Sequence, residues 1–167
     1  MSDAAGSGLS DDLAPETRLA RLGIVLPKPP GAVANYVPWA IVQGVVMTSG
    51  QLPWIDGDLK YAGRIGRDLD GDEGYQACRL ATLNAIAQLR DAAGSLDRIR
   101  RVFRLEGTLN VAEGYHDHPR ALNGASDLVM DVFGPRGLHT RMIYTNPAMP
   151  LDCACLVVLY AEIDTIP

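Results

Sequence analysis

The stretch Gly137-Leu-His-Thr-Arg-Met-Ile-Tyr-Thr-Asn-Pro-Ala-Met-Pro150 places one arginine, Arg141, at the start of a β-branched and aromatic run between two Gly/Pro breaks. Such an arginine is either the solvated start of a strand or a fixed fork for a carboxylate or phosphate, because guanidinium presents a planar set of N–H donors. Composition alone favours the solvated start, since arginine side chains are usually exposed. The choice depends on the rest of the chain.

The chain has 167 residues, a net charge of −5 and 47% hydrophobic residues. These values are typical of a single globular domain, expected over residues 15–167 after a flexible, polar tail at residues 1–14. No apolar run approaches the ~20 residues of a membrane span, and the N-terminus lacks the features of a signal peptide, so we expect a cytoplasmic protein without membrane contact.

The acidic charge argues against a nucleic-acid partner, which usually requires a basic stripe. The cysteines Cys78, Cys153 and Cys155 lie in apolar surroundings and are odd in number, which favours packing of free thiols over disulfides. His116 and His118 flank Asp117 in a loop, but this is a weak metal signal, and neither a metal nor another cofactor is expected.

Helical periodicity predicts a short helix at residues 15–22 and two main helices at residues 73–93 and 119–133. Asp70 or Asp72 is expected to cap the first main helix, with Glu73 near the positive end of its dipole. Asn84 lies among apolar residues in that helix, where it is either a buried hydrogen-bonding anchor or solvent-facing.

Strand patterns occur at residues 36–42, 45–49 and 99–111, in the opening stretch, and at residues 153–162. The last strand is almost entirely apolar, so we expect it to be buried on both faces. The predicted fold class is α+β: one mixed β-sheet with the two main helices packed on one face. Its other face is expected to be covered through oligomerisation.

Ser49-Gly-Gln-Leu-Pro53, together with an ordered set of other stretches, resembles the RidA/YjgF family, also called the L-PSP endoribonuclease family. The resemblance covers the chain from about Pro15 to the C-terminus. Its pattern is that of a longer branch of the family with an N-terminal extension. The other matching stretches are Leu22-Gly-Ile, Ala34-Asn-Tyr36, Gly74-Tyr-Gln-Ala77, Leu83-Asn84, Leu122-Asn-Gly-Ala-Ser-Asp127, Val132-Phe-Gly134 and Gly137-Leu-His-Thr-Arg141. The resemblance implies a chorismate-mutase-like fold and a homotrimer with ligand clefts between subunits.

The resemblance also implies site residues. Arg141 matches the family's carboxylate-binding arginine, which holds 2-imino or 2-oxo acids. Tyr36 and Ser49, with the neighbouring Gly50, are expected to line the cleft, and Asn123 resembles a helix asparagine beside it. With these residues present, Arg141 is better interpreted as a ligand anchor than as a solvated strand start.

One position departs from the family pattern. The resemblance places Leu156 where deaminase members carry a glutamate that positions the attacking water. Leucine can neither orient water nor accept a proton, and general acid–base help is typically worth 10²–10⁴-fold. Catalysis would therefore need a substitute such as Glu162, Glu106 or Tyr36.

Three functions follow from these residues. The first is a protein that binds 2-imino or 2-oxo acids and hydrolyses reactive enamine or imine intermediates to release ammonia, as a 2-iminobutanoate/2-iminopropanoate deaminase-type hydrolase. The alternative is a non-catalytic trimer that binds a small carboxylate ligand, motivated by Leu156. The third is an endoribonuclease, which the acidic charge and the three histidines disfavour.

Overall fold

The structure, a computed structural model, describes residues 10, 12–32 and 34–164. Its main sheet has five strands in the order β1-β2-β7-β5-β6, and β3 and β4 form a separate two-stranded sheet. The strands are β1 (Trp39–Val42), β2 (Val45–Thr48), β3 (Trp54–Ile55), β4 (Asp58–Leu59), β5 (Ile99–Leu109), β6 (Thr140–Thr145) and β7 (Cys155–Ile163). β5 pairs with β6 in parallel and with β7 antiparallel, so the sheet is mixed, as predicted.

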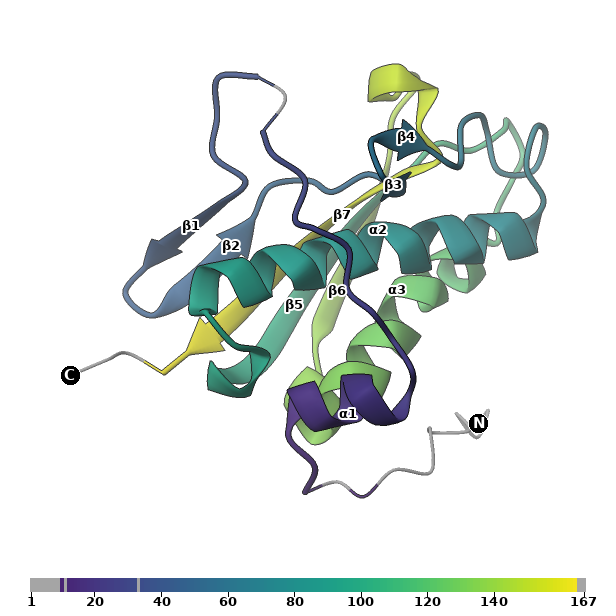
Figure 1. The fold of residues 1–167 in the computed structure, drawn as a ribbon. Helices are drawn as coiled ribbons and strands as arrows, with labels where there is room; N and C mark the ends of the chain where they lie inside the picture. Colours follow the sequence, from purple (N-terminus) through teal and green to yellow (C-terminus); the bar gives the residue numbers. More distant parts are fainter. Residues whose placement is uncertain (1–9, 11, 33, 165–167) are drawn as a thin grey trace.

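Three α-helices accompany the sheet: α1 (Pro15–Arg21), α2 (Gly71–Ala93) and α3 (His118–Phe133). Short 3-10 helices lie at η1 (Leu96–Arg98), η2 (Gly134–Gly137) and η3 (Pro150–Asp152). The two long helices run across the same face of the main sheet, and α1 lies beside α3 (Figure 1). The expected α+β class, with two main helices on one face, is therefore confirmed.

The start of α2 shows how the sequence sets an element boundary. The Asp70 carboxylate accepts hydrogen bonds from the backbone N–H groups of Asp72 and Glu73, while the Glu73 carboxylate accepts from the N–H of Asp70. This reciprocal capping box satisfies donors that lack partners inside the helix. Asp70 is the cap, and Asp72 instead pairs with Arg120.

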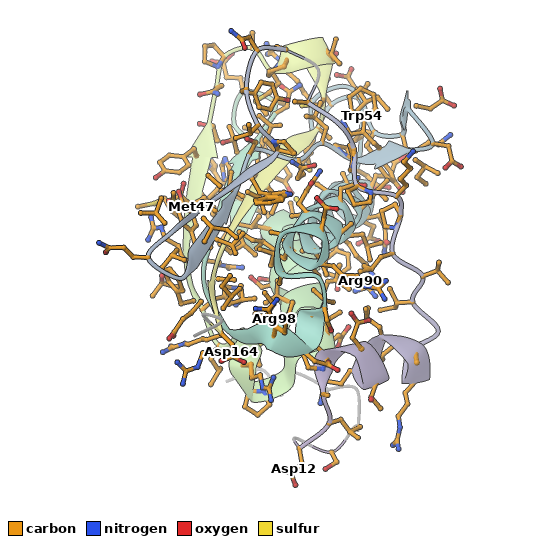
Figure 2. The ribbon with its side chains drawn as sticks, turned by 60° about the vertical axis from the view of Figure 1, so that its left-hand side comes forward. Asp12, Met47, Trp54, Arg90, Arg98 and Asp164 are labelled. Carbon is orange, nitrogen blue, oxygen red and sulfur yellow. The ribbon has the colours of Figure 1, made fainter. Side chains whose placement is uncertain are left out.

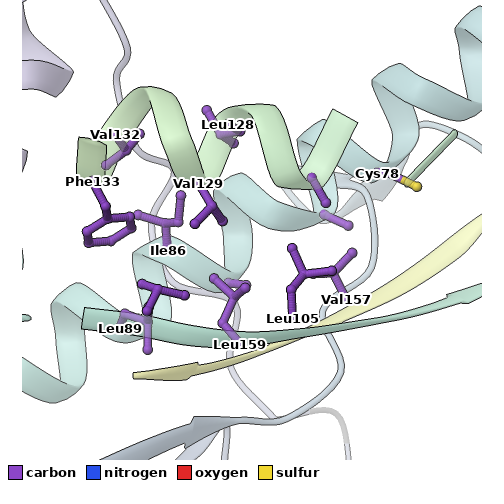
Figure 3. Close-up of a cluster of buried hydrophobic side chains, with 14 of the residues drawn as sticks. Cys78, Ile86, Leu89, Leu105, Leu128, Val129, Val132, Phe133, Val157 and Leu159 are labelled. Atoms are coloured by element: carbon purple, nitrogen blue, oxygen red, sulfur yellow. The ribbon is translucent and has the colours of Figure 1, made fainter. Parts of the chain in front are cut away.

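The hydrophobic core fills the space between the helices and the sheet (Figure 3). Leu105 and Leu159 point from β5 and β7 toward Ile86 of α2 and Val129 of α3, and all four are fully buried. Burying one such side chain contributes roughly 1.5–3 kcal/mol. Asn84 is also buried, and its amide donates to the carbonyl oxygens of Leu52 and Trp54, so it is an anchor and does not face solvent.

The opposite face of the sheet has no covering layer within the described chain. Along β7 the buried residues alternate with the partly exposed Leu156, Val158 and Tyr160, so the expectation of a strand buried on both faces is wrong for a single chain. The helices supply cover on one side only. Figure 2 shows the two sides, with Met47 on the sheet side and Arg90 beyond α2. Met47 pairs with Tyr160 across β2 and β7, which places it on the uncovered face.

The expected hairpin between β1 and β2 forms through a turn at Gln43 and Gly44, although β1 begins at Trp39 and not at Tyr36. Most of the predicted flexible tail, residues 1–9 and 11, lies outside the described residues. None of the helices in the described ranges is long and apolar enough to cross a membrane.

Candidate functional site

Arg141 lies on β6, the last strand of the main sheet. Its register partner on β5 is Leu105, which in turn pairs with Leu159 on β7. Residues that face each other across neighbouring strands share one side of a sheet, and both leucines are core residues under the helices. The Arg141 side chain therefore leaves the sheet edge on the helix side, next to α3.

Two side chains of α3 hold the Arg141 guanidinium. Nη1 donates to Asn123 Oδ1 at 2.8 Å and to Ser126 Oγ at 3.2 Å. Asn123 and Ser126 are three residues apart, so they lie on the same face of the helix. Because an Nη nitrogen carries two hydrogens, these two bonds use both donors of Nη1.

His139 completes this group. Its Nδ1 lies 2.6 Å from the carbonyl oxygen of Gly137, and its Nε2 lies 3.1 Å from Ser126 Oγ. A carbonyl oxygen only accepts, so Nδ1 carries a hydrogen and donates it. In the neutral ring, Nε2 is then free to accept the hydroxyl hydrogen of Ser126. We call Asn123, Ser126, His139 and Arg141 the arginine cluster.

Two glycines allow the backbone around the cluster to pack this closely. A Cβ at Gly124, between Asn123 and Ser126, would collide with the backbone carbonyl of Tyr75 on α2. A Cβ at Gly137 would lie 2.7 Å from the carbonyl oxygen of Val129 on α3. Only glycine permits such approaches, so Gly124 helps to set the distance between α2 and α3, and Gly137 helps to set the distance between α3 and the chain leading into β6.

The other predicted site residues gather at the opposite end of the sheet. Ser49 Oγ donates to the carbonyl oxygen of Val37 at 2.6 Å, which ties the end of β2 to the segment containing Tyr36. The Tyr36 side chain is 47% exposed. A Cβ at Gly50 would meet Leu156 Cδ2 at 3.5 Å, so Gly50 and Leu156 are neighbours. We call Tyr36, Ser49, Gly50 and Leu156 the serine corner.

A single chain does not bring the two groups together. β7 and β5 lie between β2 and β6, and neighbouring strands are about 4.8 Å apart, so strands β2 and β6 are separated by roughly 14 Å. The two groups also lie on different sides: Leu156 pairs with Thr108, which alternates with the buried Gly107 and Leu109 and therefore belongs to the uncovered face. Of the five predicted residues, the fold joins Arg141 with Asn123, and Tyr36 with Ser49 and Gly50.

The acids considered as substitutes for the missing glutamate are already paired. Glu106 accepts a hydrogen bond from Arg104 Nε at 2.7 Å, and Glu162 Oε1 lies 3.3 Å from Arg100 Nη1. Burial, with the charge of Glu106 as a smaller cause, raises the pKa of Tyr160 on the uncovered face. Neither glutamate belongs to either group, whereas Tyr36, the third substitute considered, belongs to the serine corner.

The thiols are buried and unsuited to nucleophilic chemistry. Desolvation raises the pKa of Cys153 to about 11, and a hydrogen bond with Cys78, followed by burial, raises the pKa of Cys155. Thiols with raised pKa values are protonated at neutral pH and react slowly. Within the described ranges, no group of three or more His, Cys, Asp or Glu side chains could hold a metal ion.

Comparison with known proteins identifies the family of this chain. Residues 16–163 match the model of the family described as YjgF/chorismate mutase-like, putative endoribonuclease. The chain belongs to this RidA/YjgF family. The match spans nearly all of the described chain, and it confirms the resemblance found in the sequence and the chorismate-mutase-like fold.

Individual relatives agree with the family match. The crystal structure of a putative endoribonuclease from Shewanella oneidensis MR-1 is 54% identical, with a TM-score of 0.88 over 90% of this chain and 100% of that chain. Protein TCP17 of Trypanosoma cruzi is 34% identical over 87% of this chain and 92% of its own length. The structure of E. coli TdcF with bound serine is 19% identical, with a TM-score of 0.58 over 82% of this chain and 94% of its own, and it shows the shared fold alone.

Sequence reasoning did not identify Ser126 and His139 as members of the cluster. A signal was available in their spacing. Asn123 and Ser126 are three residues apart on a helix, and His139 and Arg141 are two residues apart in an extended segment, so each pair shares a face. The spacing could not show that α3 packs beside β6, which brings the two pairs together.

Proposed function

We propose that this protein binds small 2-oxo or 2-imino carboxylates, with Arg141 as the anchor. The observation that supports this most directly is the guanidinium held by Asn123 and Ser126 at the sheet edge. A fixed guanidinium offers parallel N–H donors in the geometry of a carboxylate, and such charge-assisted pairs are among the stronger hydrogen bonds in proteins. TdcF, which shares the fold, has bound serine, itself a small molecule with a carboxylate.

The complete cleft requires a second copy of the chain. The arginine cluster and the serine corner lie at opposite ends of one sheet, so one subunit contributes the anchor and a neighbouring subunit contributes Tyr36, Ser49 and Gly50. The uncovered face adds apolar area for association, including Met142 and Tyr144, which are 45% and 44% exposed. A closed homotrimer with three equivalent clefts satisfies both features.

Binding without efficient hydrolysis is the function that the residues support best. Leu156 presents an apolar side chain to Gly50, where the resemblance expects the water-positioning glutamate. Glu106 and Glu162 are engaged by Arg104 and Arg100 and are not available in either group. Deamination of 2-imino acids is the second candidate, and family membership favours it.

Cleavage of RNA has the least support. That chemistry needs phosphate contacts together with a general acid and a general base, whereas the chain carries a net charge of −5. His139 uses both ring nitrogens within the arginine cluster. Both ring nitrogens of His139 are therefore engaged and are not left to act as the general acid or base of this reaction.

Calorimetry with 2-oxobutanoate tests the proposal. The wild type should bind, and Arg141→Ala should weaken binding about 100-fold or more, because two charge-assisted hydrogen bonds are lost. Arg100→Ala, which removes an exposed arginine paired only at the surface, should bind like the wild type. Absence of binding by the wild type across a panel of 2-oxo acids would refute the proposed ligand class.

Ammonia release separates binding from catalysis. With a freshly generated 2-imino acid, we expect wild type and Arg141→Ala to release ammonia at rates within a few-fold of the uncatalysed rate. A wild-type rate 100-fold or more above that of the variant would instead establish the hydrolase function.

A further inference from the structure

The hydrogen bonds of the arginine cluster run in one direction. Arg141 Nη1 donates to Ser126 Oγ at 3.2 Å, and guanidinium cannot accept a hydrogen bond in return. The Ser126 hydroxyl is then free to donate to His139 Nε2 at 3.1 Å. His139 Nδ1 donates to the Gly137 carbonyl oxygen at 2.6 Å, and this backbone acceptor is the last member of the series of hydrogen bonds.

This order gives each member a defined role. The Gly137 carbonyl selects the Nδ1–H tautomer of His139, Nε2 of that tautomer accepts the only hydrogen of Ser126, and the Ser126 oxygen is left to accept from Arg141. Gly137 is itself held against α3, since a Cβ at that residue would lie 2.7 Å from the Val129 carbonyl oxygen. The guanidinium is therefore tied to two rigid elements, α3 and the segment leading into β6.

The same bonds determine which edge of the guanidinium remains available. Asn123 Oδ1 and Ser126 Oγ use both hydrogens of Nη1. Among residues 10, 12–32 and 34–164, no partner takes a hydrogen bond from Nε or Nη2 of Arg141. These two nitrogens form the side edge of the guanidinium and carry parallel N–H groups that match the two oxygens of a carboxylate.

We propose that Ser126 and His139 are positioning residues for Arg141, and that they direct its Nε–Nη2 edge to the ligand as a side-on carboxylate site. This inference rests on the proposed function for the identity of the ligand. The hold on the guanidinium, in contrast, is a property of the protein without ligand. Fixing the guanidinium in advance reduces the conformational entropy lost on binding.

Arginine side-chain NMR of the protein without ligand tests the hold directly. In the wild type, slowed rotation about the Nε–Cζ bond should give separate Nη hydrogen signals for Arg141, assigned by their loss in Arg141→Lys. Ser126→Ala and His139→Ala should merge or broaden these signals. Ser126→Thr, which keeps the hydroxyl, should retain them, and so should His116→Ala, a matched histidine variant in an exposed loop.

Calorimetry with 2-oxobutanoate tests the consequence. Ser126→Ala and His139→Ala should each weaken binding by about 5- to 10-fold, the worth of roughly one hydrogen bond, while the thermal midpoint shows that both remain folded. Ser126→Thr and His116→Ala should bind like the wild type. On addition of 2-oxobutanoate, the Arg141 Hε signal should shift downfield, because Nε contacts the carboxylate.

Two results would overturn the proposal: unchanged Arg141 signals in Ser126→Ala, or a ligand that leaves Hε unmoved and displaces the Nη1 bonds. If the wild type binds no 2-oxo acid, the proposed ligand class is refuted. The NMR spectra of the protein without ligand still test whether Ser126 and His139 position the Arg141 guanidinium. Merged Nη signals in Ser126→Ala would then support the positioning role, and unchanged signals would exclude it.

Discussion

The arginine cluster and the serine corner lie at opposite ends of one sheet and are built in different ways. The cluster is a set of side chain–side chain hydrogen bonds between α3 and β6, with His139 anchored on a backbone carbonyl. The corner is joined by hydrogen bonds from Ser49 to the backbone carbonyl oxygens of Val37 and Pro38, and by an apolar contact between Gly50 and Leu156. The hydrogen bonds of the cluster hold the Arg141 guanidinium in one orientation, whereas the corner offers a surface against which a ligand could pack.

This difference predicts which region tolerates change. The members of the cluster depend on one another, because Ser126, His139 and Arg141 are partly buried and each hydrogen bond between them is worth about 0.5–1.5 kcal/mol. An apolar contact at a partly exposed position has no such requirement. Substitutions in and around the cluster should therefore cost more than comparable substitutions in the corner, and four experiments follow in order of expected effect.

The largest effect is expected from Gly124→Ala. The added methyl would collide with the Tyr75 carbonyl, where α2 and α3 pack backbone to backbone, and would push apart the helices that position Asn123 and Ser126. We expect a loss of about 3 kcal/mol in the free energy of unfolding, measured by urea denaturation, together with loss of 2-oxobutanoate binding. Gly71→Ala at the start of α2, where the nearest atom is 3.7 Å away, is the control. A loss below about 1 kcal/mol would show that the approach of α2 to α3 is not limiting.

Leu156→Glu adds a carboxylate to the serine corner and is expected to create activity, whereas Gly124→Ala is expected to remove binding. If the two groups meet between subunits, the new carboxylate lies in the cleft that receives the ligand held by Arg141. We expect ammonia release from 2-imino acids to rise by about 100-fold, the lower end of general acid–base contributions. The double variant Leu156→Glu/Arg141→Ala should lose this gain. A single variant that binds 2-oxobutanoate but gains no activity would contradict the corner's place in the cleft.

Mixing two inactive variants tests whether the groups act across subunits. Arg141→Ala removes the anchor, and Gly50→Trp fills the corner, so neither variant alone should bind 2-oxobutanoate. In a closed trimer every mixed assembly regains one intact cleft, so equal co-refolding should restore about a quarter of all sites. Calorimetric stoichiometry gives the number. Recovery of no sites, in mixtures shown by mass spectrometry to contain both variants in one assembly, would place the complete site within one chain.

The sequence predicted the positions of the helices and strands better than it predicted which elements pack against one another. Local signals such as Asp70 and Glu73 at the start of α2 carry their own physics, so capping and periodicity were sufficient there. The sequence did not show what covers the second face of β7, where Leu156 is partly exposed in a single chain, because an apolar run does not reveal which layer packs on it. The association of Arg141 with Asn123 came from resemblance, and the contacts of Ser126 and His139 depend on how close α3 lies to β6. Gly137 permits that close approach to α3, and Gly124 permits the approach of α3 to α2; neither role can be read from the sequence without the positions of the neighbouring backbone atoms.

The smallest effect is expected from Gly50→Ala, and its smallness is informative. The added methyl would meet Leu156 Cδ2 at 3.5 Å, an ordinary van der Waals contact, and Gly50 is not among the glycines with positive φ. The free energy of unfolding should change by less than about 0.5 kcal/mol, or rise slightly, because alanine restricts the unfolded chain more than glycine does. Affinity for 2-oxobutanoate should fall no more than about 3-fold if the corner provides shape and not a required hydrogen bond. A loss as large as that from Ser126→Ala would instead mean that the backbone at Gly50 contacts the ligand as closely as the arginine cluster does.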